Sequence, residues 1–276
     1  MDFKLIHIGK YNREERGSQI THAVFLGLSL YGKEQGAVYY PSGKLLSRTV
    51  PGKMKLGITP AGFRVDFAYN AQRENYVIAC ELPGLTYNEN EPFFYLHYKD
   101  SILRINPSLE LPVEKALQLR GVFEKIITLK RTPLPGNIFY AEQLCCMLIG
   151  ELAAGTVENI PNGDGKQPVT IDLAEQLRRQ LDEDERFELT LSEHCRKLGF
   201  SAGYARRVFS RRFLIEPQEY RLRRRLERIL YLLSTHRYCH KEIADMVGMK
   251  SVNHLHSFLK QRSGMTPGEI DKKFPV

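Results

Sequence analysis

The residues best placed for a specific chemical task lie in an internal repeat near the C-terminus of this 276-residue chain. Two copies of one pattern start 49 residues apart, at Thr190 and at Cys239. Each copy has a glutamate three residues after its start, then a small residue, then a glycine four residues further on. In the two copies these are Glu193 and Glu242, Cys195 and Ala244, and Gly199 and Gly248.

The repeated pattern predicts a helix, a sharp turn and a second helix in each copy. A small side chain lets the second helix approach closely, and a glycine permits the turn. Thr190 and Glu193 form a capping-box pattern at the start of the first copy, whereas Cys239 is a weaker acceptor at the start of the second. In DNA-binding proteins with this arrangement the second helix enters the major groove. Helix-glycine-helix also occurs in structural bundles, but two copies in one basic region favour DNA binding.

The positive charge of the chain is concentrated in the same region. The net charge is +8, yet residues 186–276 hold 19 Lys and Arg against 9 Asp and Glu, while residues 1–185 hold 21 against 23. Such an asymmetry favours a polyanionic partner for the C-terminal third. A basic surface that is merely solvated remains an equal alternative on charge alone.

An uninterrupted helix is predicted between the two copies, from Pro217 to about Ser234. At 1.5 Å per residue it is roughly 27 Å long. Two recognition helices at its ends would lie close to one DNA turn apart, about 34 Å. One chain is therefore expected to read two successive major grooves on one face of the duplex.

These motifs resemble those of the AraC/XylS family of bacterial regulators. The small residue, three variable residues, glycine, recognition helix and closing proline occur twice, and the prolines are Pro217 and Pro267. Arg225-Leu226-Glu227-Arg228 resembles the family's linker-helix signature. The resemblance covers about residues 170–272. It implies a transcription regulator, most often an activator, that binds double-stranded DNA and works with RNA polymerase.

The chain departs from the family pattern at several positions. Leu214 stands where a glycine usually follows the first recognition helix, and Met249 and Leu255 replace aromatic residues. Ser257 stands where many members have arginine. The second unit is therefore expected to read DNA less strongly than the first.

The resemblance also indicates which side chains contact DNA, with the first recognition helix running from about Ala202 to Arg212. Arginine bonds guanine through two hydrogen bonds and asparagine bonds adenine, while phosphate contacts position the protein without reading sequence. The alternative for each residue is a solvated surface charge. The expected base-reading residues are Arg206, Arg207, Gly203, Asn253, His256 and Ser257, and the expected phosphate contacts are Arg211, Arg212, Lys241, Lys250, Lys260 and Arg262.

The N-terminal part has a different pattern. Residues 20 to about 105 contain short β-favouring runs separated by Gly and Pro turns, which is typical of a β-sandwich or barrel. Two amphipathic helices are predicted after Pro112 and after Pro133-Leu134-Pro135. The predicted fold is α+β with two domains. A cupin-like β-barrel with two following helices occupies 1–157, a linker occupies 158–168, and an all-α DNA-binding domain occupies 169–276, with helix-turn-helix units at about 190–213 and 239–262.

The family relationship implies that the N-terminal domain senses a small effector or mediates dimerisation. The two helices either pack on the barrel or form the seam of a homodimer. A sugar or another metabolite is a candidate effector, and a scaffold without a ligand is the alternative. The candidate ligand-binding residues are Tyr39, Arg64, Phe67 and Tyr69, which would otherwise fill the barrel.

Two enzymatic alternatives are disfavoured. A cupin-type enzyme fused to a DNA-binding domain would need closely spaced metal-ligating histidines, but His7, His22 and His97 are isolated. An alkyl-transfer repair protein would need an activated cysteine, whereas Cys145 and Cys146 occupy an apolar helix. We therefore expect no catalytic activity, metal or cofactor. The odd number of cysteines, 5, and the lack of a long apolar run indicate a cytoplasmic protein that does not associate with membranes.

Overall fold

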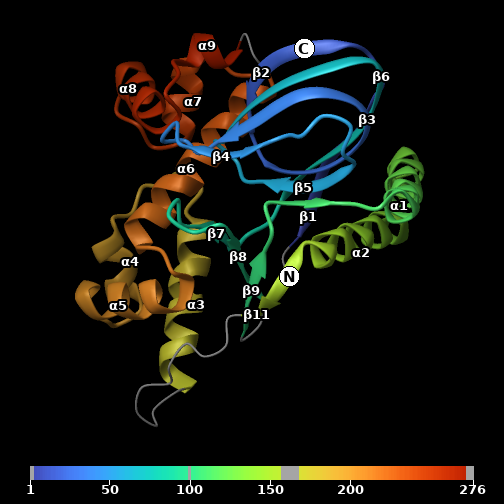
Figure 1. The fold of residues 1–276 in the computed structure, drawn as a ribbon. Helices are drawn as coiled ribbons and strands as arrows, with labels where there is room; N and C mark the ends of the chain where they lie inside the picture. The colour runs from blue at the N-terminus through green and yellow to red at the C-terminus, as the bar shows by residue number, and fades with distance from the viewer. Residues whose placement is uncertain (1–2, 99–100, 157–167, 272–276) are drawn as a thin grey trace. The chain divides into compact units, whose positions relative to one another are not determined.

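The computed structural model describes residues 3–98, 101–156 and 168–271. The chain divides into two compact units, which we describe separately (Figure 1). The first comprises residues 1–85 and 89–155, and the second comprises residues 86–88 and 156–276. The predicted linker at 158–168 lies outside the described residues except for Pro168.

The N-terminal region contains two mainly antiparallel sheets. The larger has seven strands in the order β1-β6-β3-β5-β10, with β2 also paired to β6 and β4 to β3. The smaller has the order β11-β9-β8-β7. The strands are β1 (Lys4–Tyr11), β2 (Glu15–Ile20), β3 (Val24–Tyr39), β4 (Leu45–Arg48), β5 (Lys55–Thr59), β6 (Arg64–Glu81), β7 (Leu85–Tyr87), β8 (Phe94–Tyr98), β9 (Ser101–Ile105), β10 (Ser108–Glu110) and β11 (Ala153–Thr156).

The predicted β-rich region is confirmed, but the cupin-like barrel is not. The larger sheet curves strongly (Figure 1), yet its path ends at β1 and β10, which do not pair with each other in the described part of the chain. Closing a sheet into a barrel requires its two edges to hydrogen-bond. The strands therefore form two open sheets.

Two helices follow the strands, as predicted: α1 (Val113–Arg131) and α2 (Pro135–Glu151). Each buries one apolar stripe, which in α1 includes Phe123 and Ile126. The Phe123 ring lies 5.6 Å from the ring of Tyr76 on β6, measured between centroids. One face of the helical pair is thus used for packing within the first unit.

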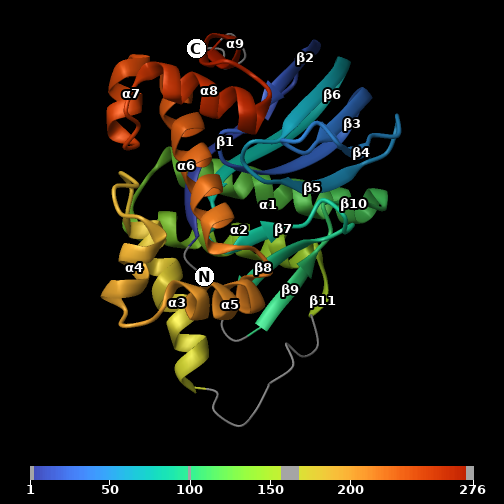
Figure 2. The same ribbon diagram turned by 90° about the vertical axis from the view of Figure 1, so that its left-hand side faces the viewer.

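Within residues 168–271 of the second unit the secondary structure is helical, and α5 and α6 occupy the ranges predicted for the first recognition helix and the linker helix. The first helix-turn-helix unit consists of α4 (Leu191–Lys197) and α5 (Ala202–Phe213), and the second of α7 (His240–Met246) and α8 (Val252–Ser263). Between them runs α6 (Pro217–Ser234). In Figure 2, α4 and α5 lie near one end of α6, and α7 and α8 near the other. The remaining helices are α3 (Pro168–Glu183) and α9 (Pro267–Asp271).

Local sequence explains where the helices of the first helix-turn-helix unit begin. Thr190 and Glu193 form the predicted capping box: the Thr190 hydroxyl accepts from the Glu193 amide at 3.3 Å, and the Glu193 carboxylate accepts from the Thr190 amide at 2.6 Å. The hydrogen bonds that the Glu193 carboxylate accepts from the Thr190 amide and from the Thr190 hydroxyl lower the pKa of Glu193. Ser201 caps α5 by accepting from the Tyr204 amide. Phe209 and Phe213 of α5 are fully buried against α3, so a packed core holds the recognition helix in place.

Candidate nucleic-acid interface

The first recognition helix, α5, separates an apolar face from a basic one. Ala205, Phe209 and Phe213 are buried. Arg207 and Arg211 are exposed one helical turn apart, and Gly203 precedes them by another turn. Apart from its chain neighbours and the backbone of its own helix, no atom of the described residues lies within 4 Å of the position of a Cβ on Gly203. The exposed face therefore offers two guanidinium groups beside a stretch of backbone without a side chain.

The arginines expected to read bases are accessible in the structure. Arg206 Nε lies 3.5 Å from a Glu216 carboxylate oxygen, and both side chains are 56% exposed. An ion pair in that setting is worth about 1 kcal/mol or less, so DNA can displace it. The Arg207 guanidinium carbon lies 5.9 Å from the centroid of the Tyr204 ring. Both arginines can reach a partner outside the chain.

The second recognition helix, α8, presents less charge. Asn253 and Ser257 are exposed, whereas His256 is half-buried. The His256 ring packs edge-on against His240 with centroids 5.5 Å apart. The packing limits the reach of His256, and α8 offers no arginine beside Asn253 and Ser257.

The expected phosphate contacts fall into two groups. Arg211, Lys241, Lys250 and Lys260 are exposed. Lys260 Nζ lies 3.9 Å from a Glu269 carboxylate oxygen in an exposed ion pair. The other two side chains are less accessible: Arg212 is 5% exposed with Nη2 3.9 Å from Glu175, and Arg262 Nη1 lies 2.8 Å from Glu219. The structure therefore brings four of the six side chains to an accessible surface and holds two against neighbouring helices.

Sequence reasoning passed over two basic residues on α4. Arg196 and Lys197 are exposed in the last turn of this helix. The first helix of such a unit crosses the DNA backbone, so both are suited to phosphates. Their position at the end of the predicted first helix is the signal that could have identified them.

The basic run of the linker helix α6 has a different role. Arg224 Nε lies 3.0 Å from Asp182, and Arg224 Nη1 lies 2.6 Å from Glu227. Arg228 Nη2 lies 3.2 Å from Glu185. These two arginines of α6 are thus paired with carboxylates within the second unit.

Comparison with known proteins agrees with this geometry. The family model described as helix-turn-helix domain matches residues 194–273. The C-terminal domain of the response regulator yesN from Fusobacterium nucleatum is 31% identical, over 36% of this chain and 98% of that chain, with a TM-score of 0.35. The chain belongs to the AraC/XylS family. Comparison with curated proteins gave no match.

The fold of this AraC/XylS-family protein also resembles a solved structure along nearly the whole chain. ToxT from Vibrio cholerae has a TM-score of 0.52 at 11% identity, covering 99% of each chain. A ToxT structure with bound (E)-4-(8-methylnaphthalen-1-yl)but-3-enoic acid gives the same TM-score at 12% identity, again over 99% of each chain. The likeness extends the shared fold to the β-rich region. The described helices of this family member include none long and apolar enough to cross a membrane.

The four candidate ligand residues of this regulator do not form one cluster. Tyr39 and Arg64 pair across β3 and β6, with the guanidinium carbon 3.9 Å from the ring centroid. Phe67 and Tyr69 lie side by side on β6, with centroids 6.0 Å apart. Arg64 and Phe67 are three residues apart on one strand, and side chains alternate along a strand. The two pairs therefore lie on opposite faces of the sheet.

The face that bears Tyr69 also bears two cationic side chains that sequence reasoning missed. Lys33 on β3 pairs with Tyr69, and its Nζ lies 5.6 Å from the ring centroid. The Arg73 guanidinium carbon lies 4.1 Å from the same ring, and its Nη1 is paired with Glu15. Burial, aided by Lys55 and Arg73, lowers the pKa of Lys33 to about 8. The cluster of Lys33, Tyr69 and Arg73 depends on the register between β3 and β6, so no local sequence motif could predict it.

The cysteines of the first unit are set for packing. Cys80 and Cys145 are buried, and burial raises the pKa of Cys145 to about 12. A thiol with so high a pKa holds almost no thiolate at neutral pH, and thiolate is the nucleophilic form. Among the described residues, no three His, Cys, Asp or Glu side chains are grouped as metal ligands.

Proposed function

We propose that this AraC/XylS-family protein is a sequence-specific transcription regulator that reads two successive major grooves with α5 and α8. The observation that carries the proposal is the pair of capped recognition helices near the two ends of α6. The 18 residues of α6 span about 27 Å, close to the length of one DNA turn.

The proposed contacts follow from exposure. Arg206, Arg207 and the backbone at Gly203 read bases in the first groove, and Asn253, His256 and Ser257 do so in the second. Since Arg212 and Arg262 are engaged within the second unit, we omit them from the phosphate contacts. The proposed phosphate contacts are Arg196, Lys197, Arg211, Lys241, Lys250 and Lys260.

Selection of binding sites from random double-stranded DNA with the full chain tests this function. We expect an enriched sequence in two parts, centred about one helical turn apart, with the stronger base preference in the part bound by α5. Enrichment of no sequence above the starting pool would contradict sequence-specific binding.

The first unit is proposed to act as the sensor, and its effector is proposed to be an acid. Lys33 has no carboxylate within ion-pair distance in the described part of the chain, and it lies beside Arg73 and the Tyr69 ring. A half-buried ammonium without a counter-ion favours an anionic ligand, because the bound anion replaces the lost hydration. The carboxylic acid bound to ToxT supports the same class.

Thermal unfolding of the full chain with the acid bound in ToxT, and with the alcohol of the same skeleton, tests the sensor. The acid should raise the unfolding temperature and the alcohol should not. Lys33→Met should abolish the shift, while the matched control Lys53→Met, on an exposed side chain, should keep it. Equal shifts in wild type and Lys33→Met would contradict the proposed site, and a chain that no acid stabilises favours the ligand-free scaffold.

A homodimer is proposed to form through the outer face of α1 and α2. These helices bury one apolar stripe but leave large apolar side chains exposed, which is typical of an interaction surface. The exposed residues on and between them are Val113, Leu117, Leu134, Phe139, Tyr140 and Met147. Light scattering should give twice the chain mass for wild type and a monomer for Phe139→Asp. Leu45→Asp, at an exposed residue on β4, is the control.

Activation is the proposed outcome of DNA binding, with RNA polymerase as the partner and the cytoplasm as the location. A transcription assay with purified polymerase and a promoter that carries the selected site measures the sign. More transcript in the presence of the protein supports activation, and less transcript would show repression instead.

A further inference from the structure

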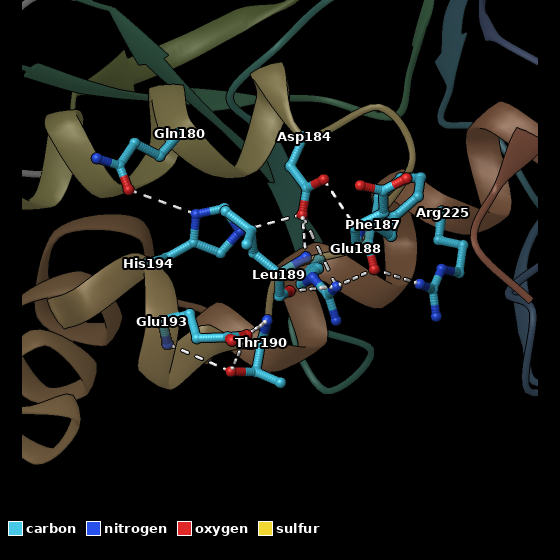
Figure 3. Close-up of polar contacts among 10 residues, drawn as sticks. Gln180, Asp184, Phe187, Glu188, Leu189, Thr190, Glu193, His194 and Arg225 are labelled. Atoms are coloured by element: carbon cyan, nitrogen blue, oxygen red, sulfur yellow. Dashed lines mark hydrogen bonds and ion pairs between the residues drawn. The ribbon is translucent and has the colours of Figure 1, made fainter. Parts of the chain in front are cut away.

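The loop between α3 and α4, residues Asp184 to Leu189, has a defined conformation held by hydrogen bonds (Figure 3). The Asp184 carboxylate accepts from the Glu188 amide at 3.1 Å and from the Leu189 amide at 3.3 Å. Phe187 is 6% exposed and has a φ of 55°, in the left-handed region that non-glycine residues rarely adopt. A strained residue in a buried position persists only where its surroundings determine it.

Two arginines of the linker helix hold this loop. Arg221 Nη2 donates to the carbonyl oxygens of Phe187 and Leu189, each at 2.5 Å, and Arg225 Nη2 donates to the Phe187 carbonyl at 3.0 Å. Burial lowers the pKa of Arg221, and it lowers the pKa of Arg225 to about 10. Removing either donor would leave a buried carbonyl with fewer partners. The loop and α6 are therefore fixed to each other.

The same loop contacts the turn of the second helix-turn-helix unit. Gly248, in the turn between α7 and α8, has a φ of 63°, and a Cβ there would overlap the carbonyl oxygen of Arg186. Gly199, the matching glycine of the first helix-turn-helix unit, has a φ of 75°, and apart from its chain neighbours no atom of the described residues lies within 4 Å of its Cβ position. The two glycines make the same kind of turn, but of the two only Gly248 packs closely against the backbone of the Asp184–Leu189 loop.

The loop also contacts the first helix-turn-helix unit. Asp184 Oδ2 lies 3.1 Å from Nε2 of His194 on α4, whose Nδ1 lies 3.4 Å from Gln180 on α3 (Figure 3). Thr190, which caps α4, directly follows the loop. The six residues Asp184 to Leu189 thus contact the first helix-turn-helix unit, the linker helix and the second helix-turn-helix unit.

We propose that the Asp184–Leu189 loop positions the second helix-turn-helix unit relative to the first and so sets the spacing between the two DNA segments that the chain reads. The inference rests on the proposed function. Base contacts require hydrogen-bond distances in both grooves at once. A small change at the Gly248 contact would move α8 away from its bases while α5 keeps its own.

The experiment measures binding of the full chain to the selected two-part site, to the same site with one base pair added or removed between its parts, and to the α5 part alone. Gly248→Ala should weaken binding to the selected site at least tenfold, change the preferred spacing, and leave binding to the α5 part unchanged. Gly199→Ala is the matched control, since it places alanine in a similar backbone conformation without a neighbour to meet, and should keep the wild-type spacing preference.

Arg225→Gln provides a second variant that removes one of the donors to Phe187 and leaves Arg221 in place. It should broaden the spacing preference, even if Gly248→Ala does not fold. Wild-type spacing preference in folded Gly248→Ala or in Arg225→Gln would overturn the proposal, as would selection by wild type of a one-part site. Failure of wild type to select any sequence would instead overturn the proposed function.

Discussion

Arg262 of the second recognition helix is held by Glu219 of the linker helix: its Nη1 lies 3.0 and 2.8 Å from the two carboxylate oxygens. Glu219 also accepts from Arg223 Nε at 3.2 Å. An arginine in this position fastens α8 to α6. Arg262 therefore has two possible roles, contact with a DNA phosphate or packing of α8 on α6, and an experiment can distinguish them.

Salt dependence of DNA binding separates the two roles. A lost phosphate contact reduces the slope of log affinity against log salt by about 0.9. We expect Lys250→Gln, at an exposed residue, to reduce the slope by about that amount. Arg262→Gln should weaken binding to the two-part site with little change in slope. An equal reduction for both variants would assign Arg262 to a phosphate.

Arg207→Ala tests base reading by the first helix-turn-helix unit. Loss of a guanidinium that bonds a guanine should cost about 1–3 kcal/mol at the selected site and relax the preference at one base pair. Competition assays with the selected site and with random DNA measure both effects. If affinity falls equally on the two DNAs, Arg207 contacts phosphate.

Leu214→Gly is expected to stabilise the protein. Leu214 ends α5 with a φ of 55°, whereas Gly264 ends α8 with a φ of 73°. The left-handed conformation costs a non-glycine residue roughly 1–2 kcal/mol, and Leu214 is 45% exposed, so the substitution loses little packing. Thermal unfolding should shift upward by roughly 2–4 °C, and the reverse control, Gly264→Leu, should shift it downward. A lower unfolding temperature for Leu214→Gly would show that the leucine side chain stabilises the turn.

The folded chain should lose stability as the pH falls, because His194 is harder to protonate in the folded state than in the unfolded state. Burial lowers the pKa of His194 below its ordinary value of 6.5, against the raising effect of Asp184, while Arg221 and Lys197 lower it further. The unfolded chain therefore binds this proton more readily than the folded chain. Its contribution is fully present above about pH 6.5 and is lost as the pH falls through and below that value.

The measurement is chemical unfolding of wild type and His194→Gln between pH 7.5 and pH 5. Wild type should lose stability more steeply than the variant over that range. His254→Gln, at an exposed histidine, is the control and should follow wild type. Parallel curves for wild type and His194→Gln would exclude His194 as the source of the pH dependence.

Local signals in the sequence were sufficient for the helical region. A capping residue, a turn glycine and a helix-starting proline act on neighbouring residues, so the ranges of α5 and α6 could be predicted. The family resemblance indicated that Leu214 stands where a glycine is usual, and the turn forms at that residue with a left-handed backbone.

Tertiary structure alone decided which charges are available and which residues meet. The sequence shows Arg212 and Arg262 as two more basic residues, but partners on α3 and α6 engage them. Likewise, Lys33 meets Tyr69 through cross-strand register, and Gly248 meets Arg186 through packing across 62 residues. Such contacts depend on how separate elements pack, because no local backbone preference brings together residues so far apart in the chain. The sequence thus determined the DNA-binding family and the recognition helices, whereas packing determined which arginines of those helices remain accessible.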